Sequence, residues 1–483
     1  MRILPPSAAR ELSPSASRSG AGSGWGVALA ALTVMAAIPI EARAAAAGQG
    51  LRVGAARVDL TPEAGKIPSG FTGVLDPIYV RSIVMDNGST RAALVSVDAG
   101  AVRSDTANHV IARAATELGI PVSQLQITAT HTHSVPFSTS ADIEEKIFRS
   151  LRDAVGRMKP ARMAYGTGVS YINVNRDRID PVTRRWWEGP NYEGTSDKTV
   201  AVIRFESLSG EPIAVYYNYA VHAVLTGTLD MISGDIPGAA SRYLEESLGA
   251  DAVALWSSGA AGDQNPIYFN QTYELREIRI REYATRGEDI SNAMPPGGQG
   301  MDRKNPRVQL LMKQQQRMSD SMGQMLGEEV LHVMRESLEK PPADMTIRGA
   351  ESLLTCPGRT RTDSGRAGFP GSYVDGEDLS IRLGALRIGD VYIGAVDGEV
   401  YSAISQRLKR ESPFKHTMMA TLTNGSAPTG YIPSDAAFGQ NVFTVLSSRL
   451  KPGCAETGIV NGLLELMVRL QGGATGSEKG NPH

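Results

Sequence analysis

The sequence predicts an α/β protein whose core is a large mixed β-sheet flanked by helices. Apolar, β-branched runs of strand length alternate with amphipathic helical segments, and clusters of Gly, Pro and Asn separate them. The composition is globular, because 41% of the 483 residues are hydrophobic, 21% are charged and the net charge is −2. This balance gives no basic footprint for a nucleic acid, so we expect no such partner.

The N-terminus has the pattern of a signal peptide over residues 1–44. Three arginines precede an apolar core at residues 24–40, and Ala42-Arg43-Ala44 then offers a small-x-small cleavage site. The apolar run is shorter than the roughly 20 residues of a membrane span, so a transmembrane anchor is the less favoured alternative. We expect a periplasmic or secreted protein with one mature domain over residues 45–472 and a disordered tail at residues 473–483.

The chain has two cysteines, Cys356 and Cys454. In an oxidising compartment they form either one disulfide bond or none, and a bond requires Cα atoms within about 7 Å. No Cys-x-x-Cys or Cys/His finger spacing exists, which argues against a structural zinc ribbon.

The first predicted elements are a strand, a hairpin and a helix. Residues 51–62 read as a strand that ends in a Thr-Pro turn. Residues 79–88 and 90–100 read as two strands joined by the Asn87-Gly88 turn. A helix is predicted over residues 105–118, and Gly119 ends it.

Helices and strands then continue to alternate. Helices are predicted over residues 140–156 and 238–249, and strands over residues 163–174, 198–207, 212–222 and 250–260.

Residues 270–306 interrupt the alternation with a charged excursion, which reads as either a lid or a solvated surface insertion. A long amphipathic helix follows over residues 308–338. The last predicted elements are strands over residues 379–389 and 390–400 and a helix over residues 402–411.

The most informative segment is ITATHTHSVP at residues 127–136, in a chain with only seven histidines. His131 and His133 stand at the end of an apolar, β-branched run. Because alternate residues of a strand point the same way, we expect both imidazoles on one face. Neutral imidazole is a good ligand for Zn²⁺, so the pair indicates a metal site. The alternative is an ordinary pair of polar histidines at a strand end.

Further ligand-type residues follow other apolar runs. His222 ends the run PIAVYYNYAVH, and Glu399 ends another apolar strand and opens a helix. Tyr431 lies in a Gly/Pro/Ser-rich loop, and a polar turn holds Asp263 and Asn265. Each has an ordinary alternative, such as core hydrogen bonding or an acidic helix start. Together they lie beyond strand ends, where open α/β sheets build their active sites.

Seven segments carry a resemblance to a known family. They are VGAARVDLTP, VSVDAG, ATHTHSVP, INVNRDR, YAVHAVLTGTLDMISGDIPGAAS, SSGAAGDQNP and NGSAPTGYIPS. Over residues 50–460 the chain resembles the neutral/alkaline, non-lysosomal ceramidases, most strongly at ATHTHSVP, which is similar to the family's T-H-T-H-S-x-P segment.

The resemblance implies a ceramidase-like zinc hydrolase domain with one Zn²⁺ per chain. Carried over by position, the zinc ligands are His131, His222, Glu399 and Tyr431. The resemblance places His133 beside the ion, where it contacts the substrate or assists proton transfer.

The remaining site residues also follow from the resemblance. Arg176, in the INVNRDR segment, is expected near the substrate. Asp263 is an alternative to His133 for passing a proton to the leaving amine. Asn265 is expected to donate a hydrogen bond to an oxyanion or a substrate hydroxyl.

Three departures from the family pattern bear on the substrate. Asn265 stands where the family has a serine, and Val135-Pro136-Phe137 replaces the Gly-Pro-Gly-Gly that follows the histidine pair. The chain also ends soon after the tyrosine motif, so we expect no C-terminal immunoglobulin-like domain. Asparagine cannot serve as an acyl-enzyme nucleophile, which favours direct attack by metal-activated water.

The expected function is zinc-dependent hydrolysis of the N-acyl bond of ceramide or a related N-acyl amide. We expect a lipid or small-molecule amide as partner, with a possible peripheral membrane contact. The alternatives are hydrolysis of a non-sphingolipid amide or peptide-like substrate, and a catalytically lapsed surface binding protein. The retention of ligand-type residues at all four metal positions favours an enzyme.

Two other metal hydrolase classes fit the histidines less well. A metallo-β-lactamase needs His-x-His-x-Asp-His, but after Ser134 the chain has Val135 and Pro136 where Asp and His are required. An amidohydrolase barrel needs a bridging lysine and two later histidines at strand ends, and the four histidines that remain after His133 barely suffice, since His332 lies in a predicted helix and His483 in the tail.

Overall fold

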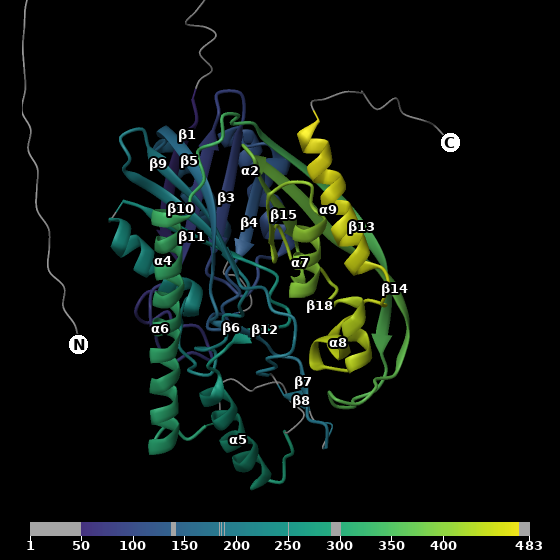
Figure 1. Ribbon diagram of the computed structural model, residues 1–483. Helices are drawn as coiled ribbons and strands as arrows, with labels where there is room; N and C mark the ends of the chain where they lie inside the picture. Colours follow the sequence, from purple (N-terminus) through teal and green to yellow (C-terminus); the bar gives the residue numbers. More distant parts are fainter. Residues whose placement is uncertain are drawn as a thin grey trace, which may run out of the picture. The chain divides into compact units, whose positions relative to one another are not determined.

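Parallel and antiparallel strands form the main sheet of the computed structural model (Figure 1). The structure describes residues 50–136, 142–182, 184, 186–187, 189–249, 251–290 and 301–472. Within these residues the order of this eight-stranded sheet is β11-β10-β9-β5-β1-β2-β3-β4. The strands are β1 (Arg52–Asp59), β2 (Tyr79–Asp86), β3 (Arg91–Val97), β4 (Leu125–Ala129), β5 (Lys159–Val169), β9 (Thr199–Ser207), β10 (Pro212–Tyr219) and β11 (Val253–Ser258). The expected signal peptide and C-terminal tail lie outside the described residues.

The pairing confirms the predicted mixed sheet. Strands β3 and β4 pair in parallel, as do β10 and β11, and the other neighbouring pairs are antiparallel. The predicted hairpin is β2 and β3, and Gly88 in its turn has φ 85°, a conformation that glycine adopts readily.

Helices bury apolar residues against this sheet. Helices α2 (Ser104–Leu118) and α3 (Ile143–Gly156) pack against β1 to β4, and α4 (Asp235–Leu248) and α6 (Pro306–Glu336) pack against β9 to β11. The predicted end of α2 is confirmed, because Gly119 is left-handed with φ 64°. The charged excursion contains a further helix, α5 (Asn270–Ala284), and residues 291–300 lie outside the described part.

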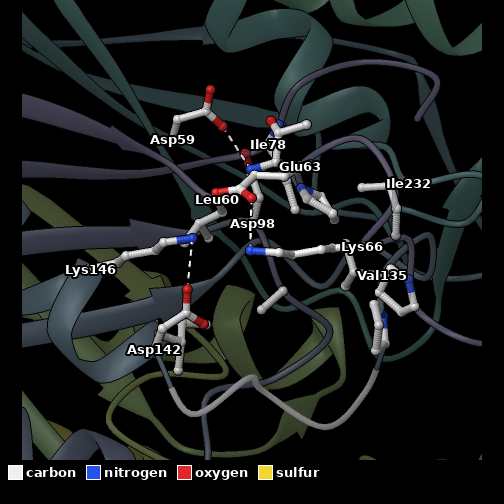
Figure 2. A pocket seen from close by; sticks show the side chains of 16 residues that line it. Asp59, Leu60, Glu63, Lys66, Ile78, Asp98, Val135, Asp142, Lys146 and Ile232 are labelled. Carbon is white, nitrogen blue, oxygen red and sulfur yellow. Dashed lines mark hydrogen bonds and ion pairs between the residues drawn. The ribbon is translucent and has the colours of Figure 1, made fainter. Parts of the chain in front are cut away.

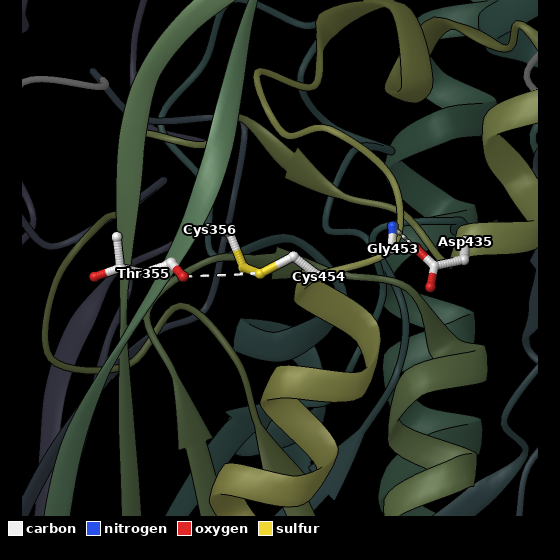
Figure 3. The surroundings of a disulfide bond; sticks show 5 residues. All are labelled: Thr355, Cys356, Asp435, Gly453 and Cys454. Atoms are coloured by element: carbon white, nitrogen blue, oxygen red, sulfur yellow. Dashed lines mark hydrogen bonds between the residues drawn. A yellow bond between two sulfur atoms is a disulfide. The ribbon is translucent and has the colours of Figure 1, made fainter.

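A second sheet has the order β13-β14-β15-β17. Its strands are β13 (Ile347–Arg361), β14 (Tyr373–Ile388), β15 (Val391–Val396) and β17 (His416–Ala420), and α7 (Ser402–Glu411) and α9 (Ala455–Gln471) cover it. The Cα atoms of Cys356 and Cys454 are 5.7 Å apart, and a disulfide bond joins β13 to the start of α9 (Figure 3).

Short elements complete the described fold. They are β6 (Asn173–Asn175) paired with β12 (Gln264–Pro266), β7 (Arg178–Ile179) with β8 (Trp186–Trp187), β16 (Glu399–Val400) with β18 (Tyr431–Ile432), the 3₁₀ helices η1 (Val122–Gln124) and η2 (Asp435–Gln440), and α8 (Phe443–Ser447). No helix among the described residues is both long and apolar enough to cross a membrane.

The segment at residues 421–424 joins the two sheets where several strands end. Thr421 N donates to Ser258 O at the end of β11 (2.8 Å), and Leu422 O accepts from Ala129 N at the end of β4 (3.2 Å). Leu422 N in turn donates to Gly398 O, just beyond β15 (3.4 Å). The ends of β4, β11 and β15 therefore meet at one place.

Candidate metal centre

His131 and His133 lie just beyond β4 rather than on it. The strand ends at Ala129, and His131 has φ 62°, a left-handed conformation that is uncommon for a residue with a side chain. The expectation that strand alternation aligns the two rings is therefore wrong, although the rings do converge. His133 N donates to Ala223 O (3.0 Å), which fixes the loop against the segment that follows His222.

Backbone carbonyls orient His131 and His222. His131 Nδ1 lies 2.6 Å from Gly100 O, and His222 Nδ1 lies 2.7 Å from Ala261 O. A carbonyl oxygen only accepts, so each Nδ1 carries the proton and each Nε2 keeps its lone pair. Metal-binding histidines are commonly held in this way.

Glu399 faces both Nε2 atoms. Its Oε2 lies 3.2 Å from His131 Nε2 and 3.3 Å from His222 Nε2. His133 Nε2 lies 3.4 Å from His131 Nε2. Among the described residues, these three histidines form a group whose potential ligand atoms all lie within 4.8 Å of one another, close enough to hold one metal ion.

These distances and the donor set fit a metal ion. His222 Nε2 and Glu399 Oε2 are buried without a hydrogen-bond partner, which is costly for polar atoms. Ligand atoms about 2.0–2.1 Å from a tetrahedral Zn²⁺ are about 3.3–3.4 Å apart, close to the separations between these atoms. The two histidine–carboxylate separations are therefore those of ligands that share one metal ion.

The protonation states agree with metal binding. Burial lowers the pKa of His222 to about 4, and burial together with the other two histidines lowers the pKa of His133 well below its usual value. Burial opposes ionisation of Glu399, but the facing imidazoles outweigh it and hold that pKa well below its usual value. Burial likewise lowers the pKa of His131, yet the Glu399 carboxylate gives a net rise. Glu399, His133 and His222 are thus held in the forms that a metal requires, an ionised carboxylate and two neutral imidazoles, whereas His131 must release the proton that Glu399 favours when a metal binds.

Tyr431 comes to the centre through strand pairing. Strands β16 and β18 are parallel, and their register places Glu399 opposite Tyr431. The Tyr431 ring centroid lies 6.5 Å from that of His222. The pairing brings together two predicted ligands that are 32 positions apart in the sequence.

Arg176 and Asn265 lie beside the centre. Arg176 is 2% exposed, and its guanidinium carbon lies 5.3 Å from the Tyr431 ring centroid. It donates through Nη2 to Gly262 O (2.8 Å) and through Nη1 to Asn265 Oδ1 (3.4 Å). Its charge is the next contributor after burial to the lowered pKa of His222, so it lies close to the histidines.

Asp263 is buried with both carboxylate oxygens engaged. Oδ1 accepts from Ser402 N (2.8 Å), and Oδ2 accepts from Ser402 Oγ (2.9 Å) and Asn175 Nδ2 (3.0 Å). These partners tie the turn at Asp263 to the start of α7. Asp263 therefore positions that turn, and its part in proton transfer stays a prediction.

A cavity of about 500 Å³ lies beside the loop that follows the histidine pair (Figure 2). Val135 and Pro136 line it together with residues from β1, α3 and the segment at residues 60–68, and with Ile78 just before β2. Two ion pairs border it: Lys66 with Glu63 (2.8 Å) and Lys146 with Asp142 (2.9 Å). The predicted metal and catalytic residues are not among its lining residues. Phe137, the third residue of this altered wall, lies outside the described residues.

Sequence reasoning missed the polar residues that support the histidine loops. Ser134, Thr226 and Asp235 are all buried, and Thr226 is hydrogen-bonded to each of the other two. A buried aspartate with positive φ at a helix start cannot be identified from sequence alone. The Ser-x-Asp pattern before α4 was the available signal.

The fold and the site together define a mixed α/β protein with a buried histidine–carboxylate centre beyond the strand ends. Residues 65–324 match the family model "Neutral/alkaline non-lysosomal ceramidase, N-terminal", which is more than half of the 483 residues. The chain belongs to the neutral/alkaline non-lysosomal ceramidase family.

Curated relatives agree at low identity. The chain is 26% identical over 283 residues to the neutral ceramidase of Pseudomonas aeruginosa, which covers 50% of this chain and 42% of that protein. It is 25% identical over 255 residues to neutral ceramidase B of Dictyostelium discoideum, which covers 44% of this chain and 35% of that protein. The match thus spans less than half the length of these relatives.

Solved structures agree on the fold. The crystal structure of the neutral ceramidase from Pseudomonas aeruginosa matches with a TM-score of 0.64 at 15% identity, over 88% of this chain and 75% of that one. A structure described as ceramidase complexed with C2 matches equally. At this identity the likeness supports the fold, and the mixed α/β architecture is confirmed.

Proposed function

We propose that this protein is a zinc-dependent amide hydrolase that cleaves the N-acyl bond of ceramide or a related N-acyl amide. The proposal rests on one observation: Glu399 Oε2 lies 3.2 Å from His131 Nε2 and 3.3 Å from His222 Nε2. Family membership supports the reaction class, since the relatives it matches are called neutral ceramidases.

His131, His222 and Glu399 would hold the zinc ion, with Tyr431 as a fourth ligand from the adjacent strand. A bound zinc ion would polarise the carbonyl of the substrate amide and activate a water molecule near neutral pH. The Gly100 and Ala261 carbonyls keep the two imidazoles in the tautomer that this role requires.

The neighbouring side chains take the remaining roles. His133, whose pKa burial lowers, is neutral and assists transfer of a proton to the leaving amine. Because Arg176 donates to Asn265 Oδ1, the Asn265 amide is oriented with Nδ2 as its donor. That donor stabilises an oxyanion or binds a substrate hydroxyl.

A non-sphingolipid amide is the second candidate substrate. Val135-Pro136-Phe137 replaces the Gly-Pro-Gly-Gly of the family pattern, and Val135 and Pro136 line the 500 Å³ cavity next to the histidine loop. A changed wall at this position favours an acyl group or amine of different shape.

The location follows from the sequence pattern. With a signal peptide at residues 1–44, the protein works in the periplasm or outside the cell, and a lipid substrate brings it into peripheral contact with a membrane. Cell fractionation tests the location: a cytoplasmic, full-length product would contradict it.

The deciding experiment measures hydrolysis of a fluorescent N-acyl-sphingosine with and without a chelator and added zinc. We expect fatty-acid release that the chelator abolishes and zinc restores. His131→Ala and His222→Ala should lose zinc and turnover together, while His109→Ala, an exposed histidine on α2, should retain both. Zinc binding without ceramide hydrolysis directs the search to other amides, and full activity in His131→Ala overturns the proposed metal centre.

A further inference from the structure

A buried hydrogen-bond chain joins the loop of His131 and His133 to the loop that follows His222. Asp235 Oδ2 accepts from both Thr226 N and Thr226 Oγ1, each at 2.7 Å. Thr226 Oγ1 lies 2.6 Å from Ser134 Oγ. Because the Thr226 hydroxyl donates to the carboxylate, Ser134 is the donor in the second bond.

Three further bonds cross between the same segments. Thr132 Oγ1 donates to Ser233 O (2.8 Å), Ser233 N donates to Ser134 O (3.1 Å), and His133 N donates to Ala223 O (3.0 Å). The placement of Ser134 relative to Thr226 therefore sets where His133 and His131 stand relative to His222.

Asp235, which ends this hydrogen-bond chain, adopts an unfavourable backbone conformation. It is the first residue of α4, is 1% exposed and has φ 54°, in the left-handed region that disfavours side chains. Its amide donates to Ser233 Oγ (2.9 Å), and Oδ1 accepts from Ile236 N (2.7 Å). Strain of this kind persists where surrounding bonds hold it, often at functional sites.

We propose that Asp235 and Thr226 are positioning residues of the metal centre, acting through Ser134 to hold the two histidine loops at metal-binding distance. The inference rests on the proposed function. It assigns a role to two residues outside the predicted ligand set, in the way that outer hydrogen-bond partners commonly tune metal sites.

The same loop offers a matched control. Thr228 is buried like Thr226 and lies two positions further, but its Oγ1 donates to Gln315 on α6 (2.8 Å) instead of facing Ser134. Thr226→Val and Thr228→Val each remove one buried hydroxyl from the loop. Their comparison separates a role in the metal centre from a general loss of packing or hydrogen bonding.

The experiment measures Zn²⁺ affinity by competition with a chromophoric chelator and the visible spectrum of the Co²⁺-substituted protein. Thr226→Val should bind zinc about 10–100-fold more weakly, with an altered Co²⁺ spectrum. Thr226→Ser, which keeps the hydroxyl, and Thr228→Val should bind within about 3-fold of the wild type, well below the 10–100-fold effect expected of a lost outer partner.

Asp235→Asn supplies a second test that keeps the residue's size and its tolerance of positive φ. Its amide nitrogen must face either the Thr226 donors or the Ile236 amide, so a weakened zinc site is again expected. Equal losses in Thr226→Val and Thr228→Val, or unchanged affinity in Thr226→Val, overturn the positioning role alone. Absence of zinc binding by the wild type overturns the proposed function itself, together with this inference.

Discussion

At the residue scale, two backbone carbonyls decide the chemistry of the imidazoles. Gly100 O and Ala261 O take the Nδ1 protons of His131 and His222, which leaves both Nε2 atoms as acceptors. Glu399 Oε2 is an acceptor as well, so the three atoms repel one another unless a metal ion lies among them or a proton binds, and Glu399 does raise the pKa of His131. This arrangement is difficult to explain as ordinary core packing, and it favours a cation at this place.

Asp177 gives a residue-scale prediction about pH. Burial raises its pKa to about 7; the Tyr401 hydroxyl, which donates at 2.5 Å, opposes the rise, and nearby Asp263 adds to it. Between pH 4 and pH 7 the folded state therefore holds a proton that the unfolded state releases, so the free energy of unfolding falls as pH rises, by up to about 1.4 kcal/mol per pH unit.

Asp177→Asn should remove this contribution. Its loss of stability between pH 5 and pH 8, measured by urea unfolding, should be smaller than that of the wild type by roughly 2–3 kcal/mol. Asp251→Asn, at an exposed position, serves as control. The same pH dependence in Asp177→Asn and the wild type would show that Asp177 ionises normally in the folded protein.

At the element scale, strands with clear apolar patterns were predictable and their long-range pairing was not. The hairpin of β2 and β3 and the bounds of α2 and α7 follow closely from local signals such as Asn87-Gly88 and Gly119. Strand β13 was missed because its buried and exposed residues do not alternate regularly. The pairing of β16 with β18 depends on contacts between distant segments, which no local pattern encodes.

The same distinction applies to the candidate site. The sequence supplied the residue types at His131, His222, Glu399 and Tyr431, and the structure brings the first three within contact distance. The convergence of His131 and His133 depends on the left-handed backbone at His131, whereas the sequence pattern predicted a strand. Turns of this kind are set by tertiary hydrogen bonds and are therefore beyond a local pattern.

The disulfide between Cys356 and Cys454 gives an element-scale prediction. It closes a loop of 98 residues between β13 and α9, and removing a bridge across so long a loop typically costs about 2–5 kcal/mol. The Cys356→Ala/Cys454→Ala variant should melt at a lower temperature yet keep its zinc content at 25 °C, since neither cysteine lies at the metal centre. An unchanged melting temperature would mean that the bridge does not form or does not constrain the unfolded chain.

At the scale of the whole molecule, the metal centre draws its residues from both sheets. His131 and His222 follow β4 and β10 of the eight-stranded sheet, whereas Glu399 lies just beyond β15 of the second sheet. The segment at residues 421–424 already links these strand ends by hydrogen bonds. A bound ion therefore adds a second link between the two sheets.

This link would make the proposed zinc ion a stabiliser of the folded protein. At a free zinc concentration 100 times the dissociation constant, binding adds about 2.7 kcal/mol to the free energy of unfolding. For a chain of this length we expect the melting temperature to rise by about 2–5 °C on zinc addition and to fall again with a chelator. Glu399→Gln, which removes the contribution of the second sheet, should lose most of this rise. Glu144→Gln, at the surface of α3, should keep it, and an equal rise in both variants would mean that Glu399 is not a ligand.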